Sequence, residues 1–393
     1  MHIAVVSPFV DRQHGTERAV SELVQRLATK FGCEIDIYAQ RVVGLPLRTD
    51  DRDKDELHRI RWRRVLSIQG PHLLKFIAWY CFNFLQRRWD RIAGRGKFDL
   101  VFSPGINCPD ADLILVHAVF HRMAELKREC SPRGLRGFHQ KLYYKLICRL
   151  ERRTYTRKSV ALAAVSSRTA RQLSQYFGRD DVRVIPNGVD TEEFQPAKRI
   201  AMRETSRREL GISPEQKALL LVGNDWRSKG LESLLKATKL CPDLPLRVIV
   251  VGDDEQTSFL ASAQQLRVAD RLIFRTTSHD ILKYYGAADI VAAPSLEDSF
   301  NLPCLEAMAC GLPVILSPEA GVSEWITAGE DAILLKDPRD AVEIAQAIRL
   351  LATDSQRAER MGEKAVRTAA TLDWDRHATE VFELLSRSRR ERS

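Results

Sequence analysis

The sequence lacks the signatures of several protein classes. Its eight cysteines include no C-x-x-C pair and no metal-ligand spacing, so neither a disulfide scaffold nor a zinc module is expected. They lie in apolar runs, which predicts buried, reduced thiols of a cytoplasmic protein. The longest apolar run, Leu73–Leu85, has 13 residues and includes Lys75, whereas a bilayer requires about 20. The strand-like start His2–Pro8 has no basic region or cleavage pattern, so no signal peptide is expected.

The sequence does contain the pattern of two folded domains. Its 393 residues exceed what one hydrophobic core usually serves, and 44% hydrophobic with 29% charged residues is ordinary for a globular protein. Short apolar runs alternate with amphipathic stretches of helical length, which is typical of parallel sheets built from βαβ units. Strands are expected at residues 2–7, 33–39, 98–103, 112–117, 159–165, 182–186, 217–223, 246–252, 271–275, 289–293, 313–317 and 332–335. The predicted fold class is α/β, with two Rossmann-like domains.

The domain boundary is expected near Pro186–Asp190, where turn residues close a strand. The polar stretch 191–214 has little apolar periodicity and is interpreted as the linker. One more amphipathic helix is expected from Trp374 to Leu385, followed by a frayed basic end.

Charge is distributed unevenly between the two halves. Residues 1–190 carry 34 Lys and Arg against 20 Asp and Glu, and residues 191–393 carry 27 against 32, which together give the net +9. The excess gathers in 52–97 and 122–158, which indicates an anionic partner for the first half. Apolar residues alternate with cations along one part of this region: Tyr143, Tyr144, Leu146, Ile147 and Leu150. Two interpretations stay open, an interfacial helix on an anionic membrane and a domain helix with a solvated basic face.

Two loops carry glycine beside a predicted helix. Gly15 precedes a helix, where it permits either an anion at the free backbone N–H groups or simply a tight turn, since G-x-G-x-x-G is absent. In the second half the loop 223–230 bears Arg227 and Lys229. These cations either neutralise a diphosphate or are ordinary solvated charges.

The most informative segment is 294–315, which predicts strand, polar loop, helix and strand. Glu306 is expected in the first turn of that helix, with Asp298 in the preceding loop. A carboxylate there can accept both hydroxyls of a ribose, and free N–H groups at 300–303 would face phosphate. Alternatively, Glu306 only complements the helix dipole.

These segments resemble glycosyltransferase family 4, the retaining GT-B-fold enzymes that use nucleotide sugars. The most specific match is Pro294–Val314 to the signature P-S-x-x-E-x-F-G-x-x-x-L-E-A-M-A-x-G-x-P-V, supported by Val184–Asp190. The resemblance implies parallel sheets facing across an interdomain cleft. It also implies an acceptor-binding, membrane-facing domain at 1–190, a nucleotide-sugar domain at 191–372, and a terminal helix at 373–393 packing back on the first domain.

The resemblance also implies roles for individual residues. Glu306 corresponds to the ribose-binding Glu, while Asp298 stands where another Glu contacts the donor sugar, with Glu297 beside it as the alternative. The implied catalytic residues are Lys229, Arg227, Asp298 and His117, with His121 a second choice for the histidine. The implied donor-binding residues are Gly15, Gly223, Asn224, Ser299, Phe300, Asn301, Leu302 and Glu306. Asn224 replaces an expected Arg and Asn301 an expected Gly, which are departures from the family.

The implied activity is metal-independent hexosyl transfer from UDP-glucose to a lipid-linked saccharide. The sequence resembles in particular the branch of glucosyltransferase I type that builds lipopolysaccharide core, which implies a peripheral protein on the inner face of the cytoplasmic membrane. Partners would be the UDP-sugar, a glycolipid and an anionic membrane surface met by Arg122–Lys158, with no nucleic acid and no cofactor. UDP-GlcNAc, UDP-galactose and GDP-mannose remain alternative donors. A sugar-nucleotide epimerase, a phosphorylase and a non-catalytic membrane-docking scaffold are rival hypotheses for the function.

Overall fold

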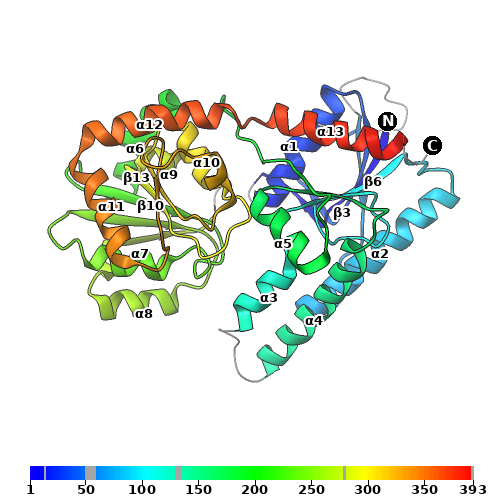
Figure 1. Ribbon diagram of the computed structural model, residues 1–393, viewed down its shortest axis with the longest axis horizontal. Helices are drawn as coiled ribbons and strands as arrows, with labels where there is room; N and C mark the ends of the chain where they lie inside the picture. Colours follow the sequence, from blue (N-terminus) through cyan, green and yellow to red (C-terminus); the bar gives the residue numbers. More distant parts are fainter. Residues whose placement is uncertain (13–14, 49–58, 129–134, 278–279, 391–393) are drawn as a thin grey trace. The chain divides into compact units, whose positions relative to one another are not determined.

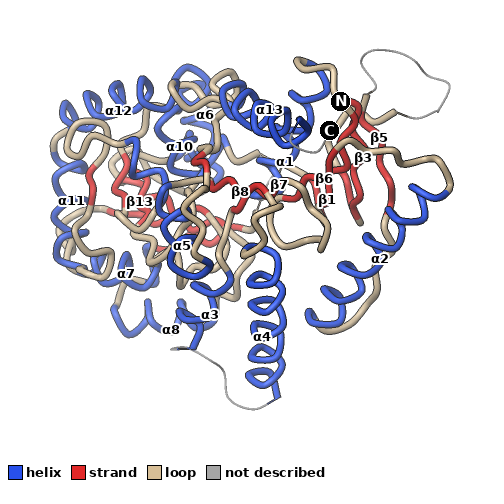
Figure 2. The backbone as a smooth tube through the Cα atoms, turned by 45° about the vertical axis from the view of Figure 1, so that its right-hand side comes forward, coloured by secondary structure: helices blue, strands red, loops and turns tan. Residues whose placement is uncertain are grey.

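The computed structural model describes residues 1–393 except 13–14, 49–58, 129–134, 278–279 and 391–393. The chain divides into two compact units, Met1–Pro186 with Asp375–Ser393, and Asn187–Trp374. Each unit is built on a parallel sheet accompanied by helices (Figure 1, Figure 2). The predicted fold class, α/β with two domains of parallel sheet, is confirmed.

The first unit contains a seven-stranded sheet in the order β5-β3-β1-β6-β7-β8-β9. Its strands are β1 (His2–Val6), β3 (Glu34–Ala39), β5 (Ile60–Arg64), β6 (Leu100–Ser103), β7 (Leu113–Val116), β8 (Ala161–Ala164) and β9 (Arg183–Val184). A separate short pair joins β2 (Phe9–Val10) to β4 (Arg41–Val42). The sequence predicted all of the main strands except β5, because an edge strand rich in arginine lacks a buried apolar run.

Six helices accompany this sheet in the described part of the chain. They are α1 (Gly15–Thr29), α2 (His72–Ile92), α3 (Phe120–Arg128), α4 (Leu135–Tyr155), α5 (Ser167–Phe177) and α13 (Trp374–Arg390). Helix α13 packs beside α1, where Phe382 stacks on Phe31 with ring centroids 4.3 Å apart. It continues beyond the predicted end, and Arg389 pairs with Asp99 at 3.2 Å. The expected frayed basic end is therefore helical as far as Arg390.

The second unit contains a six-stranded parallel sheet in the order β12-β11-β10-β13-β14-β15. The strands are β10 (Lys217–Val222), β11 (Leu246–Val251), β12 (Leu272–Arg275), β13 (Ile290–Ala293), β14 (Val314–Leu316) and β15 (Ile333–Leu334). Its helices are α6 (Pro196–Glu209), α7 (Leu231–Lys239), α8 (Thr257–Leu266), α9 (Leu282–Ala287), α10 (Leu302–Ala309), α11 (Ala341–Thr353) and α12 (Ser355–Ala370), with 3-10 turns at Ala269–Arg271 and Gly321–Trp325. Alternate residues of β10 and β11 pack against α7 to form the core.

The linker predicted at 191–214 is wrong, because most of it is helix α6. This helix packs on α9, and Arg203 and Arg207 donate to the carbonyls of Ala288 and Ala287 at its end, polar contacts that a search for apolar periodicity does not detect. Arg203 and Arg207 reach Asp289 at 2.6 and 3.0 Å. Burial alone would raise the pKa of Asp289, but the Ala218 N–H and the two guanidinium groups hold it below its usual value.

Two further expectations need correction. Cys81 is exposed and Cys148 half-buried, whereas Cys33, Cys108, Cys241, Cys304 and Cys310 are buried free thiols and Cys130 lies outside the described residues.

Helix α4 turns Ile147 and Leu150 toward the core of its unit and presents Phe138 and Leu142 to solvent. The helix therefore packs against its own domain, while contact of its exposed face with a membrane stays a prediction. In the described part of the chain no helix is long and apolar enough to cross a bilayer.

Candidate active site

The loop from β10 to α7 holds Lys229 by local geometry. Gly223 has φ of 132°, and a Cβ at this position would lie 2.9 Å from Cε of Lys229, so glycine leaves room for the lysine stem. Trp226 is fully buried and packs against Phe259 and Phe274. The backbone N–H of Trp226 also donates to Asp254 at 2.5 Å. A buried aromatic anchor thus fixes the loop that carries the lysine.

Lys229 meets the loop that follows β13. Its Nζ lies 2.5 Å from Oδ2 of Asp298, and the two side chains are 20% and 10% exposed. The other Asp298 oxygen accepts the N–H of Phe300 at 3.2 Å. The structure therefore brings together two residues that lie 69 positions apart in the sequence. Of the two neighbouring carboxylates, Asp298 rather than Glu297 is the one placed on the lysine.

The loop between β13 and α10 is held by contacts on both sides. Gly230 adopts φ of 77°, and a Cβ there would lie 1.9 Å from the carbonyl oxygen of Pro294, so the two loops touch through glycine. The N–H of Leu296 donates to the Ser228 carbonyl at 2.7 Å. On the other side, the carbonyl of Phe300 accepts from the N–H of Val322 at 2.8 Å. These contacts preorganise the loop that leads into α10.

The structure explains why asparagine can stand at position 301, where the resemblance leads one to expect glycine. It has φ of 76°, a conformation that favours glycine but that asparagine tolerates. Its side chain caps α10 by accepting the N–H of Cys304 at 3.2 Å, and its amide reaches Ser295 at 3.3 Å. Asn301 thus supplies the glycine conformation and an N-cap together.

Glu306 lies in the second turn of α10, not in the first as predicted, because the helix begins at Leu302. The N–H groups expected to be free at 300–303 are also fewer, since Phe300 donates to Asp298 and Pro303 has none. Glu306 is 6% exposed, and Oε2 accepts the hydroxyl of Tyr285 at 2.7 Å. Burial, together with the Glu306 charge, raises the pKa of Tyr285 well above its ordinary value, so the phenol stays a donor.

Asn224 and Arg227 occupy different places on the β10–α7 loop. The Asn224 side chain accepts the N–H of Asp253 at 2.8 Å and so joins two neighbouring loops at the carboxyl ends of β10 and β11. Arg227 is exposed. This edge of a parallel sheet is where open α/β folds bind ligands. The expectation that Arg227 neutralises a diphosphate stays a prediction.

In the first unit, Gly15 and His117 follow the carboxyl ends of β1 and β7. Gly15 is the first residue of α1, while His14 lies outside the described residues. His117 Nδ1 donates to the Leu115 carbonyl at 3.2 Å. His121, the second choice, is bound at 2.6 Å to Glu151, which is fully buried. That carboxylate also accepts the first N–H groups of α3, so it fixes the start of this helix.

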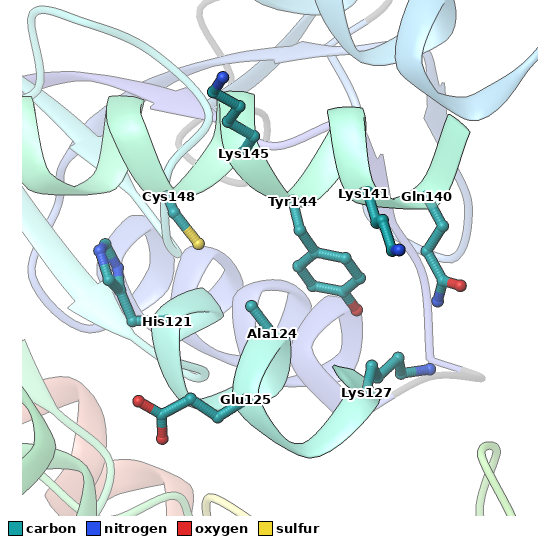
Figure 3. Close-up of a pocket in the computed structure, with 9 residues that line it drawn as sticks. All are labelled: His121, Ala124, Glu125, Lys127, Gln140, Lys141, Tyr144, Lys145 and Cys148. Atoms are coloured by element: carbon teal, nitrogen blue, oxygen red, sulfur yellow. The ribbon is translucent and has the colours of Figure 1, made fainter. Parts of the chain in front are cut away.

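His121 and Glu151, together with Cys148, form the metal-compatible group that the described part of the chain contains. Their ligand atoms lie within 4.8 Å of one another. His121 and Cys148 also line a pocket of about 680 Å³ between α3 and α4 (Figure 3). The Glu151 oxygens are already committed to the N–H groups of Phe120 and His121, which argues against an ion there. Asp110 and Asp112, one of several pairs of aspartates spaced by one residue in the sequence, also contact the protein itself, since Asp112 accepts the N–H of Val101 at 2.8 Å. Asp110 pairs with Arg87 at 2.7 Å.

Sequence reasoning missed Tyr285 and the capping role of Asn301. Tyr285 lies on the short helix α9, and no motif singles out a tyrosine there, so only the fold reveals its bond to Glu306. Asn301 could have been found, because Asn directly before an apolar helical run is a recognised N-cap signal.

Family comparisons cover most of the chain. Residues 14–193 match the model described as Glycosyltransferase Family 4, and residues 202–368 match Glycosyl transferases group 1. A D-inositol 3-phosphate glycosyltransferase of Nocardia farcinica is 30% identical over 239 residues, covering 57% of this chain and 52% of the relative. The chain thus spans about half the length of the curated relatives it matches.

Comparisons with solved structures agree on the fold. WaaG, a glycosyltransferase involved in lipopolysaccharide biosynthesis, superposes with a TM-score of 0.79 at 20% identity, covering 98% of this chain and 99% of WaaG. HepE of Anabaena in complex with UDP-glucose gives 0.71 at 18% identity, covering 98% and 99%. At these identities the likeness concerns the fold.

Proposed function

The chain belongs to the GT-B glycosyltransferases of family 4, and we propose that it transfers a hexose, with retention, from UDP-glucose to a lipid-linked saccharide such as lipopolysaccharide core. The observation that carries the proposal is the pairing of Lys229 with Asp298, on the loop that leads from β13 into the helix α10 that holds Glu306. The solved relative with UDP-glucose bound supports this choice of donor.

Glu306 would hold the donor's ribose. Its carboxylate is nearly buried and already orders one donor, the hydroxyl of Tyr285, so its second oxygen is held in a fixed direction. A buried carboxylate recognises a diol because each hydroxyl left without a partner costs about 1–3 kcal/mol. Tyr285 then acts as a positioning residue for Glu306.

Lys229 and Arg227 would stabilise the negative charge that develops on the leaving diphosphate, in place of a metal ion. Backbone N–H groups around Asn301 and Leu302 would add to this at the start of α10. Retention requires no strong side-chain base, because the departing phosphate can accept the acceptor's proton on the same face of the sugar. Asp298 would orient the donor sugar while holding Lys229.

The first unit would bind the acceptor and rest on an anionic membrane. Helix α2 exposes an apolar stripe, with Leu74, Leu85 and Trp89 at 52%, 58% and 63% exposure. Leu66, Ile68, Ile77, Ile92 and, on α4, Phe138 and Leu142 are exposed as well. Exposed cations such as Lys75, Arg88 and Arg91 accompany the stripe. Apolar residues interleaved with cations suit an anionic bilayer surface better than solvent.

The curated relatives suggest a second candidate acceptor. They are named for D-inositol 3-phosphate, so a phosphorylated small molecule is the alternative to a glycolipid.

Two experiments test the proposal. Release of nucleotide from UDP-glucose, UDP-GlcNAc, UDP-galactose and GDP-mannose, measured with and without EDTA, should show turnover of UDP-glucose that EDTA leaves unchanged. Absence of turnover and of binding for every donor would favour the non-catalytic scaffold.

Co-sedimentation with anionic vesicles should be lost in a Trp89→Ser, Phe138→Ser variant and kept in Val342→Ser, whose side chain is 55% exposed in the second unit. Equal binding to zwitterionic vesicles would contradict membrane docking through charge.

A further inference from the structure

The loop that carries Lys229 contains three residues in left-handed backbone conformations. Gly223 and Gly230, at its two ends, have φ of 132° and 77°, and Asp225 between them has φ of 56°. This region costs free energy for any residue with a side chain, although aspartate tolerates it better than most. Such a conformation persists only where the surrounding structure holds it.

A helical turn follows Asp225 and includes the lysine. The Asp225 carbonyl accepts the N–H of Lys229 at 3.0 Å, and the Trp226 carbonyl accepts that of Leu231 at 3.0 Å. The N–H of Trp226, at the start of this turn, has no acceptor within the turn itself, as at the start of any helix. Asp254 supplies the acceptor at 2.5 Å from the neighbouring loop between β11 and α8. A charged side chain from another segment of the chain thus caps the turn.

A second bond runs between the same two loops in the opposite direction. The Asn224 side chain accepts the N–H of Asp253 at 2.8 Å. Each loop therefore gives one side-chain oxygen to the backbone of the other. These two bonds are called the Asn224–Asp254 clamp below.

A glycine lets the two loops approach each other closely. A Cβ at Gly252 would lie 2.4 Å from the carbonyl oxygen of Gly223 and 2.6 Å from Nε1 of Trp226. The loops after β10 and β11 therefore touch through their backbones as well as through the clamp.

We infer that Asn224 and Asp254 are positioning residues, which fix the turn after Asp225 and thereby hold Lys229 in place for the donor's diphosphate. The diphosphate in this statement rests on the proposed function, whereas the restraint on the lysine does not. Without Asp254, the N–H of Trp226 would lose its acceptor in a residue that is fully buried. The inference also explains Asn224, which restrains the loop at a position where the resemblance leads one to expect arginine.

Hydrogen exchange of the full chain without ligand tests the restraint. Lys229, Gly230 and Leu296 report on it, because their N–H groups donate to Asp225, Arg227 and Ser228 and not to the clamp. In Asp254→Ala their exchange should be at least about tenfold faster, as expected when a bond to a charged group is lost. Asn224→Ala, which removes a neutral bond, should have an effect of about threefold.

The neighbouring carboxylate is the matched control for exchange. Glu255 is exposed on the same loop as Asp254, so Glu255→Ala should leave exchange at Lys229 and Leu296 unchanged. Unchanged exchange in Asp254→Ala, or equal acceleration in Glu255→Ala, overturns the inference.

Turnover of UDP-glucose tests whether the restraint acts through the lysine. In Asp254→Ala, kcat should fall at least about tenfold and KM change less than about threefold, because Lys229 stabilises charge that develops during transfer. Asp254→Asn keeps an acceptor oxygen and should lower kcat less than about threefold. In a chain that already carries Lys229→Ala, Asp254→Ala should lower kcat less than about twofold further.

The two measurements separate the inference from the proposed function. An equal loss of kcat with and without Lys229 would show that Asp254 does not act through the lysine, and would overturn the inference. If the unaltered chain turns over no UDP-glucose while Asp254→Ala still accelerates exchange at Lys229, the proposed function fails and the restraint on the lysine is supported.

Discussion

Replacing Asp298 by Asn should tighten UDP binding while slowing transfer. In the structure, Lys229 Nζ is held 2.5 Å from Asp298, so an incoming diphosphate must compete with this carboxylate for the lysine. Asparagine has the same shape and can still accept the N–H of Phe300. The substitution therefore removes the negative charge and leaves the loop in place.

The magnitude follows from the exposure of the pair. Bonds between charged groups contribute about 1.5–3 kcal/mol, and the lower part of this range applies because Lys229 is 20% exposed and screened by water. Releasing about 1–2 kcal/mol makes UDP bind roughly 5- to 30-fold more tightly. Transfer should fall about tenfold, because the charged partner of the donor sugar is lost.

Calorimetric titration of UDP measures the effect, and a double-mutant cycle isolates it. Asp298→Asn should bring no gain in a chain that already carries Lys229→Ala. Glu297→Gln, which removes the neighbouring carboxylate, is the matched control and should leave UDP affinity unchanged. Unchanged or weaker UDP binding by a folded Asp298→Asn protein would show that Asp298 does not compete with the diphosphate for Lys229. Tightening by Glu297→Gln instead would assign the role to that residue.

Three further changes have defined outcomes. Lys229→Ala should lower kcat at least about a hundredfold in a nucleotide-release assay, with EDTA without effect; strict dependence on added Mn²⁺ would contradict the metal-free mechanism. Gly230→Ala should cost about 2–4 kcal/mol of unfolding free energy in urea, against about 1 kcal/mol for Gly211→Ala, whose φ of 67° is similar but whose Cβ would meet nothing within 4 Å; equal losses would argue against the loop contact. Burial lowers the pKa of His377 to about 4, from 6.5, while its ring donates to Pro186, so the unfolded chain takes up the proton first as pH falls. The contribution of His377 to stability should be complete above pH 6.5 and decline toward pH 4 by up to about 3 kcal/mol, and His377→Gln should flatten this pH dependence. If the His377→Gln protein kept the same pH dependence of unfolding in urea, burial of His377 would not be its cause.

Periodicity predicted the parallel strands because each is a short buried run between turns. It failed for α6, whose contacts with Asp289 are made by Arg203 and Arg207, since a helix stabilised by guanidinium groups has no apolar stripe to detect. It also left α4 open, because an apolar stripe beside cations suits both a membrane and a domain core. Only tertiary contacts show that Ile147 faces inward and Phe138 outward.

The candidate site likewise has features that the sequence predicts and features that it does not. The carboxylates and the lysine could be predicted because family motifs fix their spacing along the chain. The pairing of Lys229 with Asp298 and of Tyr285 with Glu306 could not, because each joins loops or helices that only the folded sheet brings together. The shift of Glu306 into the second turn of α10 follows from the capping by Asn301, which fixes where the helix begins.

Recognition of a nucleotide sugar depends above all on the carboxylate of Glu306 holding the ribose, and the affinity of Glu306→Ala for UDP, beside that of the unaltered chain, measures this directly. We expect a loss of at least about thirtyfold, because two ribose hydroxyls lose their partner at about 1–3 kcal/mol each. Glu306→Gln, which keeps one acceptor oxygen, should lose less. Unchanged affinity of a folded Glu306→Ala protein for UDP would contradict a ribose-binding role for this carboxylate.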